Sequence, residues 1–105
     1  MDIKTIETKV TRTSPGNYAL GRKNEKGKFL VGYVGRSDSD VGNRLKKWVG
    51  KTERPLFKFC YASSPKAAFE KECENYHDFN PPDNDIHPDR PEDTNWRCPM
   101  CDIFG

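Results

Sequence analysis

Two cysteines near the C-terminus have the spacing of a metal site. Cys98-Pro99-Met100-Cys101 places two thiols two residues apart with a proline between them, a tight turn that presents both thiolates to one ion. A structural disulfide is disfavoured in a chain that we expect to be cytoplasmic. A redox dithiol would normally open a helix, whereas only residues 102–105 follow this pair. The pair therefore predicts a structural Zn²⁺ site.

Zinc needs two more ligands, and the sequence offers three candidates. Cys73 and His77 are four residues apart, on one face of a helix predicted over residues 65–77. With the two thiols they would fasten the C-terminal tail to this helix. His87 is the competing fourth ligand. Cys73 is equally suited to be a small buried residue beside Phe69, so the ligand set stays open at this point.

A second group, in the first half of the chain, combines tyrosine, glycine and arginine. Gly16-Asn17-Tyr18 is followed by Tyr33-Val34-Gly35-Arg36 and then by Arg44. Arginine offers a forked set of donors that suits the oxygens of a phosphate. Tyrosine has a reference pKa of about 10, so it is a poor base unless nearby cations lower that value. Taken singly, each tyrosine would be ordinary strand packing and Arg44 a solvated helix residue.

These residues fall on elements that the sequence predicts. Strands are expected over residues 17–22 and 28–36, joined by a turn in which Gly27 can take a positive φ. The second strand has apolar residues on both faces, which predicts that it is the central strand of the sheet. Residues 1–13, rich in β-branched types, are expected to form an edge strand.

A helix over residues 41–49 follows the N-cap residues of Ser37-Asp38-Ser39-Asp40. A third strand over residues 56–62 contains Cys60, which we expect in the core. Ser64-Pro65 then begins the last helix. The expected fold is α/β of the α+β kind, a small three-stranded antiparallel sheet flanked by helices.

The length of 105 residues predicts one domain, and 33% hydrophobic against 32% charged residues predicts a small core. Residues 1–80 are the expected core. Residues 81–105 hold five of the eight prolines and form an extension of the same domain, which needs a staple because it cannot build regular structure by itself.

The sequence resembles the GIY-YIG nuclease family over roughly residues 16–80. The resemblance lies in the two tyrosine phrases and in the order of the predicted elements, which is strand, strand, helix, strand, helix. Gly16-Asn17-Tyr18 matches the first motif, with asparagine in place of its middle apolar residue. Tyr33-Val34-Gly35 matches the second, with valine in place of isoleucine. These motifs are moderately specific.

Three further positions carry the resemblance. Arg44 matches the family arginine on the first helix, and Glu72, four residues after Ala68, matches the glutamate that holds the catalytic metal. Arg36 stands where many members carry a cation. Trp48 stands where many members have a histidine, which changes a local DNA contact but not the central chemistry.

The resemblance implies a metal-dependent endonuclease, or nickase, that hydrolyses DNA phosphodiester bonds. Glu72 would hold Mg²⁺ or Mn²⁺, while Arg44 and Arg36 would bind phosphate oxygens. One of Tyr18 and Tyr33 would accept the proton of the attacking water, with its pKa lowered by the metal and arginine, and the other would hold that water. The catalytic set is thus Tyr18, Tyr33, Arg44 and Glu72.

The charge distribution suits a nucleic-acid partner. Residues 1–60 hold 14 Lys and Arg against 6 Asp and Glu, whereas residues 61–105 hold 4 against 10. A basic half favours phosphate binding through counterion release. On charge alone, a solvated lysine-rich surface explains the pattern better.

Two other functions stay open. The chain would be a non-catalytic nucleic-acid-binding zinc module if it kept the fold and lost turnover, or a protein-interaction domain if it used the acidic tail. Nuclease cores of this family are commonly fused to a DNA-binding domain, so a protein partner is a candidate source of specificity. No apolar run reaches the roughly 20 residues of a membrane helix, and Met1-Asp2-Ile3-Lys4 lacks a signal-peptide hydrophobic region.

Overall fold

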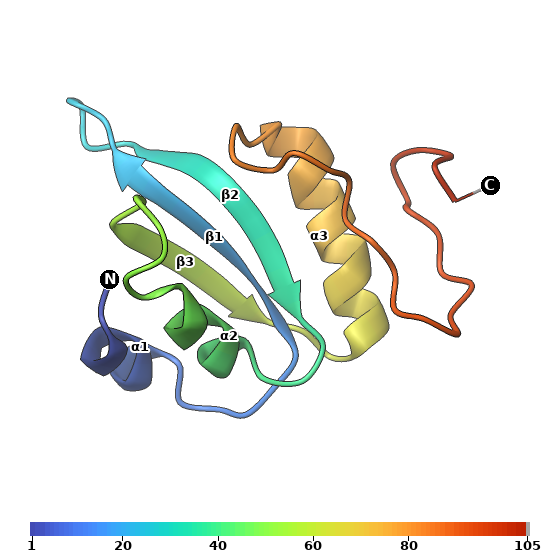
Figure 1. The fold of residues 1–105 in the computed structure, drawn as a ribbon, viewed down its shortest axis with the longest axis horizontal. Coiled ribbons are helices and arrows are strands. Elements are labelled where there is room, and N and C mark those ends of the chain that lie inside the picture. Colours follow the sequence, from blue (N-terminus) through green and yellow to red (C-terminus); the bar gives the residue numbers. More distant parts are fainter. Residues whose placement is uncertain (105) are drawn as a thin grey trace.

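The protein is a three-stranded antiparallel sheet with helices on both faces (Figure 1). A computed structural model describes residues 1–104. The α+β fold class predicted from the sequence is confirmed. In chain order the elements are α1 (Ile3–Lys9), β1 (Gly16–Lys23), β2 (Phe29–Ser37), α2 (Val41–Trp48), β3 (Leu56–Tyr61) and α3 (Pro65–Phe79).

The strand order is β2-β1-β3, so β1 is the central strand and the prediction that residues 28–36 are central is wrong. Tyr18 of β1 lies opposite Gly35 on one side and Phe59 on the other. The outer edge of β2 is covered by Asn84, whose side chain accepts from the Val34 N–H (2.8 Å) and donates to the Val34 carbonyl (3.0 Å). Asn84 thus satisfies backbone groups at the open edge of β2, while contacts with α2 and α3 account for the apolar residues of this strand.

The prediction of an edge strand over residues 1–13 is also wrong, because this segment contains the helix α1. The Asp2 carboxylate caps the helix by accepting from the Thr5 N–H (2.7 Å). Ile6 is fully buried against the sheet and α2. Capping and the burial of one side chain outweigh the β-branched composition of the segment.

The two faces of β1 meet different helices. Tyr18 and Leu20, two residues apart, face α1 and α2 and form a buried cluster with Ile6, Val41 and Leu45. Asn17 points to the opposite face and donates to the carbonyl of Ala68 in α3 (2.8 Å). Because successive strand residues point to opposite faces, this alternation fixes which helix each β1 residue meets.

The predicted helix starts are confirmed. Asp40 caps α2 by accepting from the Asn43 N–H (3.1 Å), and Ser64 caps α3 by accepting from the Ala67 N–H (3.0 Å).

Cys60 was expected in the core, but it is exposed on the edge strand β3. None of the helices formed by residues 1–104 has the length and apolar character that a membrane crossing requires.

Residues 81–104 form no helix or strand and lie along the outer side of α3 (Figure 1). The Arg54 guanidinium fixes the start of this tail with two hydrogen bonds to the Asp83 carboxylate (2.9 and 3.1 Å). The Asp83 N–H also donates to the Gly32 carbonyl (2.8 Å). Gly32 has no side chain, and a Cβ there would collide with the Arg54 guanidinium.

Candidate functional site

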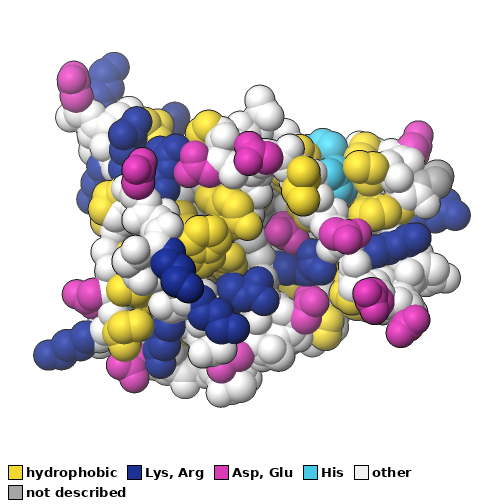
Figure 2. Space-filling model, in the orientation of Figure 1, with side chains coloured by type: hydrophobic (Ala, Val, Ile, Leu, Met, Phe, Trp, Pro, Cys, Tyr) yellow, Lys and Arg dark blue, Asp and Glu magenta, His cyan; other side chains and the backbone are white. Residues whose placement is uncertain are grey.

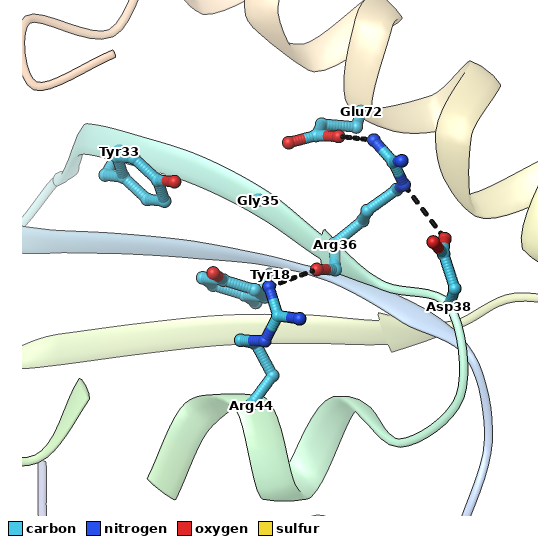
Figure 3. A pocket seen from close by; sticks show the side chains of 7 residues that line it. All are labelled: Tyr18, Tyr33, Gly35, Arg36, Asp38, Arg44 and Glu72. Atoms are coloured by element: carbon cyan, nitrogen blue, oxygen red, sulfur yellow. Dashed lines mark hydrogen bonds and ion pairs between the residues drawn. The ribbon is translucent and has the colours of Figure 1, made fainter. Parts of the chain in front are cut away.

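One cavity of about 190 Å³ is lined by all five residues that the sequence predicted to act on phosphate: Tyr18, Tyr33, Arg36, Arg44 and Glu72. They reach it from β1, β2, α2 and α3, elements that are far apart in the sequence. Figure 3 shows these side chains converging from both sides of the sheet edge. The lining residues are Tyr18, Tyr33, Gly35, Arg36, Asp38, Arg44 and Glu72.

Tyr18 lies deepest in this cavity, with only 3% of its surface exposed. Its hydroxyl accepts a hydrogen bond from the Trp48 indole N–H (2.8 Å). Gly35 faces the phenol from β2, and a Cβ there would collide with the Tyr18 hydroxyl. Burial raises the pKa of Tyr18 to about 12, more than the Trp48 hydrogen bond and Arg44 lower it. Tyr18 is therefore a neutral phenol at ordinary pH.

Tyr33 is half-buried beside Tyr18 and Trp48, with ring centroids at 6.3 Å and 5.0 Å respectively. Burial and the nearby Glu72 carboxylate raise the pKa of Tyr33, and Arg44 lowers it by less. Arg44 alone therefore does not lower the pKa of either tyrosine below its ordinary value, and the expected lowering by metal and arginine together stays a prediction. Desolvation outweighs the attraction of the arginine for both phenols.

Glu72 lies on α3 and is buried, although the sequence alone would equally allow it to lie on an exposed face of that helix. Its Oε1 accepts from Arg36 Nη1 (2.5 Å), and Arg36 Nε donates to Asp38 Oδ1 (2.9 Å). Burial raises the pKa of Glu72 despite the Arg36 ion pair. In Figure 3 the second Glu72 oxygen points away from Arg36, on the side of Tyr33. A carboxylate oxygen without a hydrogen bond among residues 1–104 is a suitable ligand for a hard divalent cation.

Arg44 lies at the mouth of the cavity on the exposed side of α2. Its Nη1 makes one long hydrogen bond to the Arg36 carbonyl (3.4 Å). Among residues 1–104, no carboxylate forms an ion pair with it. The Arg44 charge is therefore free to meet an anion, whereas Arg36 already serves two carboxylates.

A second group lies where the tail meets α3. The ligand atoms of His77, His87, Cys98 and Cys101 all lie within 4.8 Å of one another. The His87 Nε2 is 3.3 Å from His77 Nε2 and 3.4 Å from Cys101 Sγ. Tetrahedral zinc with bonds of about 2.1 Å places its ligand atoms roughly 3.4 Å apart. These four residues therefore fit a zinc ion.

The second nitrogen of His87 supports this fit. His87 Nδ1 lies 2.8 Å from the Pro88 carbonyl, which can only accept, so Nδ1 carries the proton. Nε2 is then unprotonated, the form that binds metal. Burial opposes ionisation of Cys98, but nearby contacts, chiefly the hydrogen bond from the Met100 N–H, lower the pKa of its thiol to about 6.

Cys73, one of the predicted ligands, lies outside this group. It is fully buried in a cluster with Phe69 and Cys98. Burial raises the pKa of Cys73, which disfavours the thiolate that zinc requires. The structure thus brings His87, the alternative that the sequence left open, to the other three ligands, and gives Cys73 the packing role.

Three residues that support the cavity, only the first of which lines it, were not predicted to act there. Asp38 holds Arg36, Trp48 holds the Tyr18 hydroxyl, and Asn17 ties β1 to α3. Asp38 was noticed only as part of a run of N-cap residues. Asn17 stood out as the polar residue inside a strand motif, which is a usable signal because a buried amide needs hydrogen-bond partners.

Comparisons with known proteins found no match for this chain, whether among protein-family models, curated proteins or solved structures. Two features bear on function. A polar cavity gathers two tyrosines, two arginines and two carboxylates. A His/Cys group on the tail could hold a metal such as zinc.

Proposed function

We propose that the protein is a metal-dependent endonuclease that nicks DNA by hydrolysing phosphodiester bonds, in the manner of the GIY-YIG family that its sequence resembles. One observation carries the proposal: Tyr18, Tyr33, Arg36, Arg44 and Glu72, chosen from the sequence, line a single cavity. A folding core has no need to gather these types at one solvent-accessible point. The chemistry of phosphate cleavage needs cations, a metal-binding carboxylate and groups that orient water.

Each side chain has a task in this reaction. Arg44, with no carboxylate partner among residues 1–104, binds a non-bridging oxygen of the scissile phosphate. Glu72 would hold Mg²⁺ or Mn²⁺, since one of its oxygens is left without a hydrogen bond from Arg36. When bound, the ion stabilises charge on the leaving oxygen and lowers the pKa of a water. Arg36 orients the Glu72 carboxylate and adds positive charge beside the phosphate.

The two tyrosines have different tasks: one holds the attacking water and the other accepts its proton. Tyr18 accepts a hydrogen bond from Trp48, so its own proton is directed elsewhere and can hold the attacking water. Tyr33 is less buried than Tyr18, which makes it the better candidate to lose its own proton first and then, as the phenolate, to accept a proton from the attacking water. Charge stabilisation by the arginines then matters more than base strength, since both phenols are neutral without metal.

The tail site has a structural task in this proposal. Zn²⁺ bound by His77, His87, Cys98 and Cys101 fastens residues 81–104 to α3. The same helix carries Glu72 next to Cys73, whose side chain packs in the tail cluster. Zinc thereby helps to fix the position of the catalytic carboxylate without taking part in the cleavage.

A second candidate function is a non-catalytic nucleic-acid-binding zinc module. The observation that favours it is the ion pair between Glu72 and Arg36, because this pair satisfies the carboxylate without any metal. In such a module the arginines would bind phosphate and Glu72 would only hold Arg36 in place.

Cleavage of supercoiled plasmid decides between the two. Purified protein with Mg²⁺ is expected to convert supercoiled plasmid to the open circle, and EDTA is expected to stop it. Glu72→Ala should lower the rate by about 100-fold or more, because a metal ligand is lost. Glu74→Ala is the matched control, since Glu74 lies on the same helix with 43% of its side chain exposed. No nicking, or nicking that survives EDTA and Glu72→Ala, would reject the enzyme.

A further inference from the structure

A second cavity adjoins the first and shares three of its residues. It measures about 260 Å³ and extends from Tyr18, Tyr33 and Arg44 along the exposed side of α2. Its remaining walls are Lys47, Trp48 and Lys51. The cleavage mechanism uses only the indole N–H of Trp48, to orient Tyr18, and it uses neither lysine, so the arrangement of these side chains needs its own explanation.

The floor of this second cavity is aromatic. The rings of Tyr33 and Trp48 lie with centroids 5.0 Å apart and planes inclined by 55°. Both rings are only half-buried, so each keeps part of its surface open to a ligand. An exposed aromatic face next to cations is the type of surface on which an unstacked nucleobase binds.

The rim of the cavity is cationic. Arg44, Lys47 and Lys51 are all exposed, and among residues 1–104 none of them forms an ion pair. By contrast, the neighbouring Lys46 pairs with Glu7 (3.5 Å) on the other side of α2. Figure 2 shows Lys and Arg side chains beside hydrophobic ones in the middle of this face. Three unneutralised cations around an aromatic floor match a phosphate backbone with its base turned inward.

We propose that this second cavity binds an unpaired nucleotide next to the scissile phosphate, with its base stacked on Trp48 and its phosphates on Lys47 and Lys51. The inference rests on the proposed nuclease function and names its substrate class: DNA with unpaired nucleotides. In a regular duplex the base faces are covered by their neighbours, so stacking on Trp48 requires a single strand or a junction. Arg44 lines both cavities and so links the bound nucleotide to the cleavage site.

Equilibrium binding in EDTA tests this assignment without cleavage. The probes are a labelled oligothymidylate and a labelled hairpin duplex, measured by fluorescence anisotropy. Trp48→Ala should weaken binding of oligothymidylate about 10-fold and leave duplex affinity within about twofold, because one base stack is lost. Trp48→Phe keeps a stacking ring but loses the hydrogen bond to Tyr18, so it should bind oligothymidylate nearly as the wild type does. Equal loss for both probes, or none, would overturn the proposal.

A lysine pair tests the same cavity if Trp48→Ala does not fold. Lys47→Gln with Lys51→Gln should weaken oligothymidylate binding and reduce the slope of log affinity against log salt by about 1.4, since each single-strand phosphate contact contributes about 0.7. Lys66→Gln is the control, because Lys66 is exposed at the start of α3 and lines neither cavity. An unchanged slope, or an equal effect of Lys66→Gln, would overturn the proposal.

The two proposals fail separately. Selective single-strand binding without nicking would reject the nuclease and keep the nucleotide site. Nicking with no single-strand preference would reject the nucleotide site and keep the nuclease.

Discussion

The cavity at the sheet and the His/Cys group on the tail are built in different ways. Each side chain that carries the proposed catalysis lies on a strand or helix, where the pleat or the helical turn sets its direction. Of the four candidate zinc ligands, only His77 lies on a regular element, while His87, Cys98 and Cys101 lie in a tail without helix or strand. The first site is positioned by the helices and strands, whereas the second, with zinc bound as proposed, would fasten the tail to α3.

The two sites also differ in whether their metal-binding side chains have cationic partners. In the cavity, the Glu72 and Asp38 carboxylates both pair with Arg36, so each of them has a cationic partner even without metal. In the tail group, two imidazoles and two thiols meet with no cationic side chain among them. Metal removal should therefore stop the chemistry of the first site and loosen the structure of the second.

The largest expected effect is that of zinc on stability. Removing zinc should lower the free energy of unfolding by about 4 kcal/mol for protein kept at a free zinc concentration near 1,000 times its Kd. Hydrogen exchange should then rise in residues 81–104, while the amides of β1 stay protected because its pairing with β2 and β3 needs no metal. Uniform deprotection of sheet and tail would contradict the comparison.

Matched cysteine variants sharpen the assignment of the ligands. Cys101→Ser and His87→Ala should lose zinc by elemental analysis, whereas Cys60→Ser should keep it, because Cys60 is exposed and outside the group. Cys73→Ala should also keep zinc, although it leaves a cavity in the cluster around Phe69. Loss of zinc from Cys73→Ala alone would restore Cys73 as the fourth ligand.

The next largest expected effect is the loss of nicking rate when Arg44 is replaced. Arg44→Ala should slow plasmid nicking by about 100-fold or more, the usual cost of removing one preorganised donor from a transition state. Thermal unfolding should be unchanged, because the exposed Arg44 side chain makes only one long hydrogen bond. Lys66→Ala serves as the control for lost surface charge. A rate within threefold of wild type would remove Arg44 from the reaction.

The smallest expected effect concerns the ionisation of Tyr18. Its pKa in the folded protein is about 12, against an unfolded value near 10, so folding is favoured fully below pH 10 and this contribution is lost as the pH rises through 12. An ultraviolet titration of wild type minus Tyr18→Phe should give a single step with a midpoint near 12. A step near 10 would show that cations, not burial, control the phenol.

The cavity was predictable from sequence because its residues sit at fixed positions on regular elements. Tyr18, Tyr33, Arg44 and Glu72 each fall on an element whose type the sequence predicted correctly. Their pKa values were not predictable, since burial depends on packing that only the folded chain defines. The partners of Arg36 were missed for the same reason.

The errors arose where distant segments meet. β2 was predicted as central because both of its faces are apolar, but Asn84, far along the chain, occupies the edge at which a further strand would pair. The sequence left Cys73 and His87 as rivals because the path of the tail, which brings His87 to His77, is set by side-chain contacts rather than by a repeating pattern. Residues 1–13 contain a helix despite their β-branched composition, because the Asp2 carboxylate caps its first turn.

One measurement tests the central claim, that the protein has a catalytic and a structural metal site. Crystals of the zinc-containing protein soaked in Mn²⁺ would be measured by anomalous scattering at the zinc and manganese edges. The account predicts zinc among His77, His87, Cys98 and Cys101, and manganese beside Glu72 in the cavity with Arg44. Manganese bound only on the tail, or absent from Glu72, would contradict it.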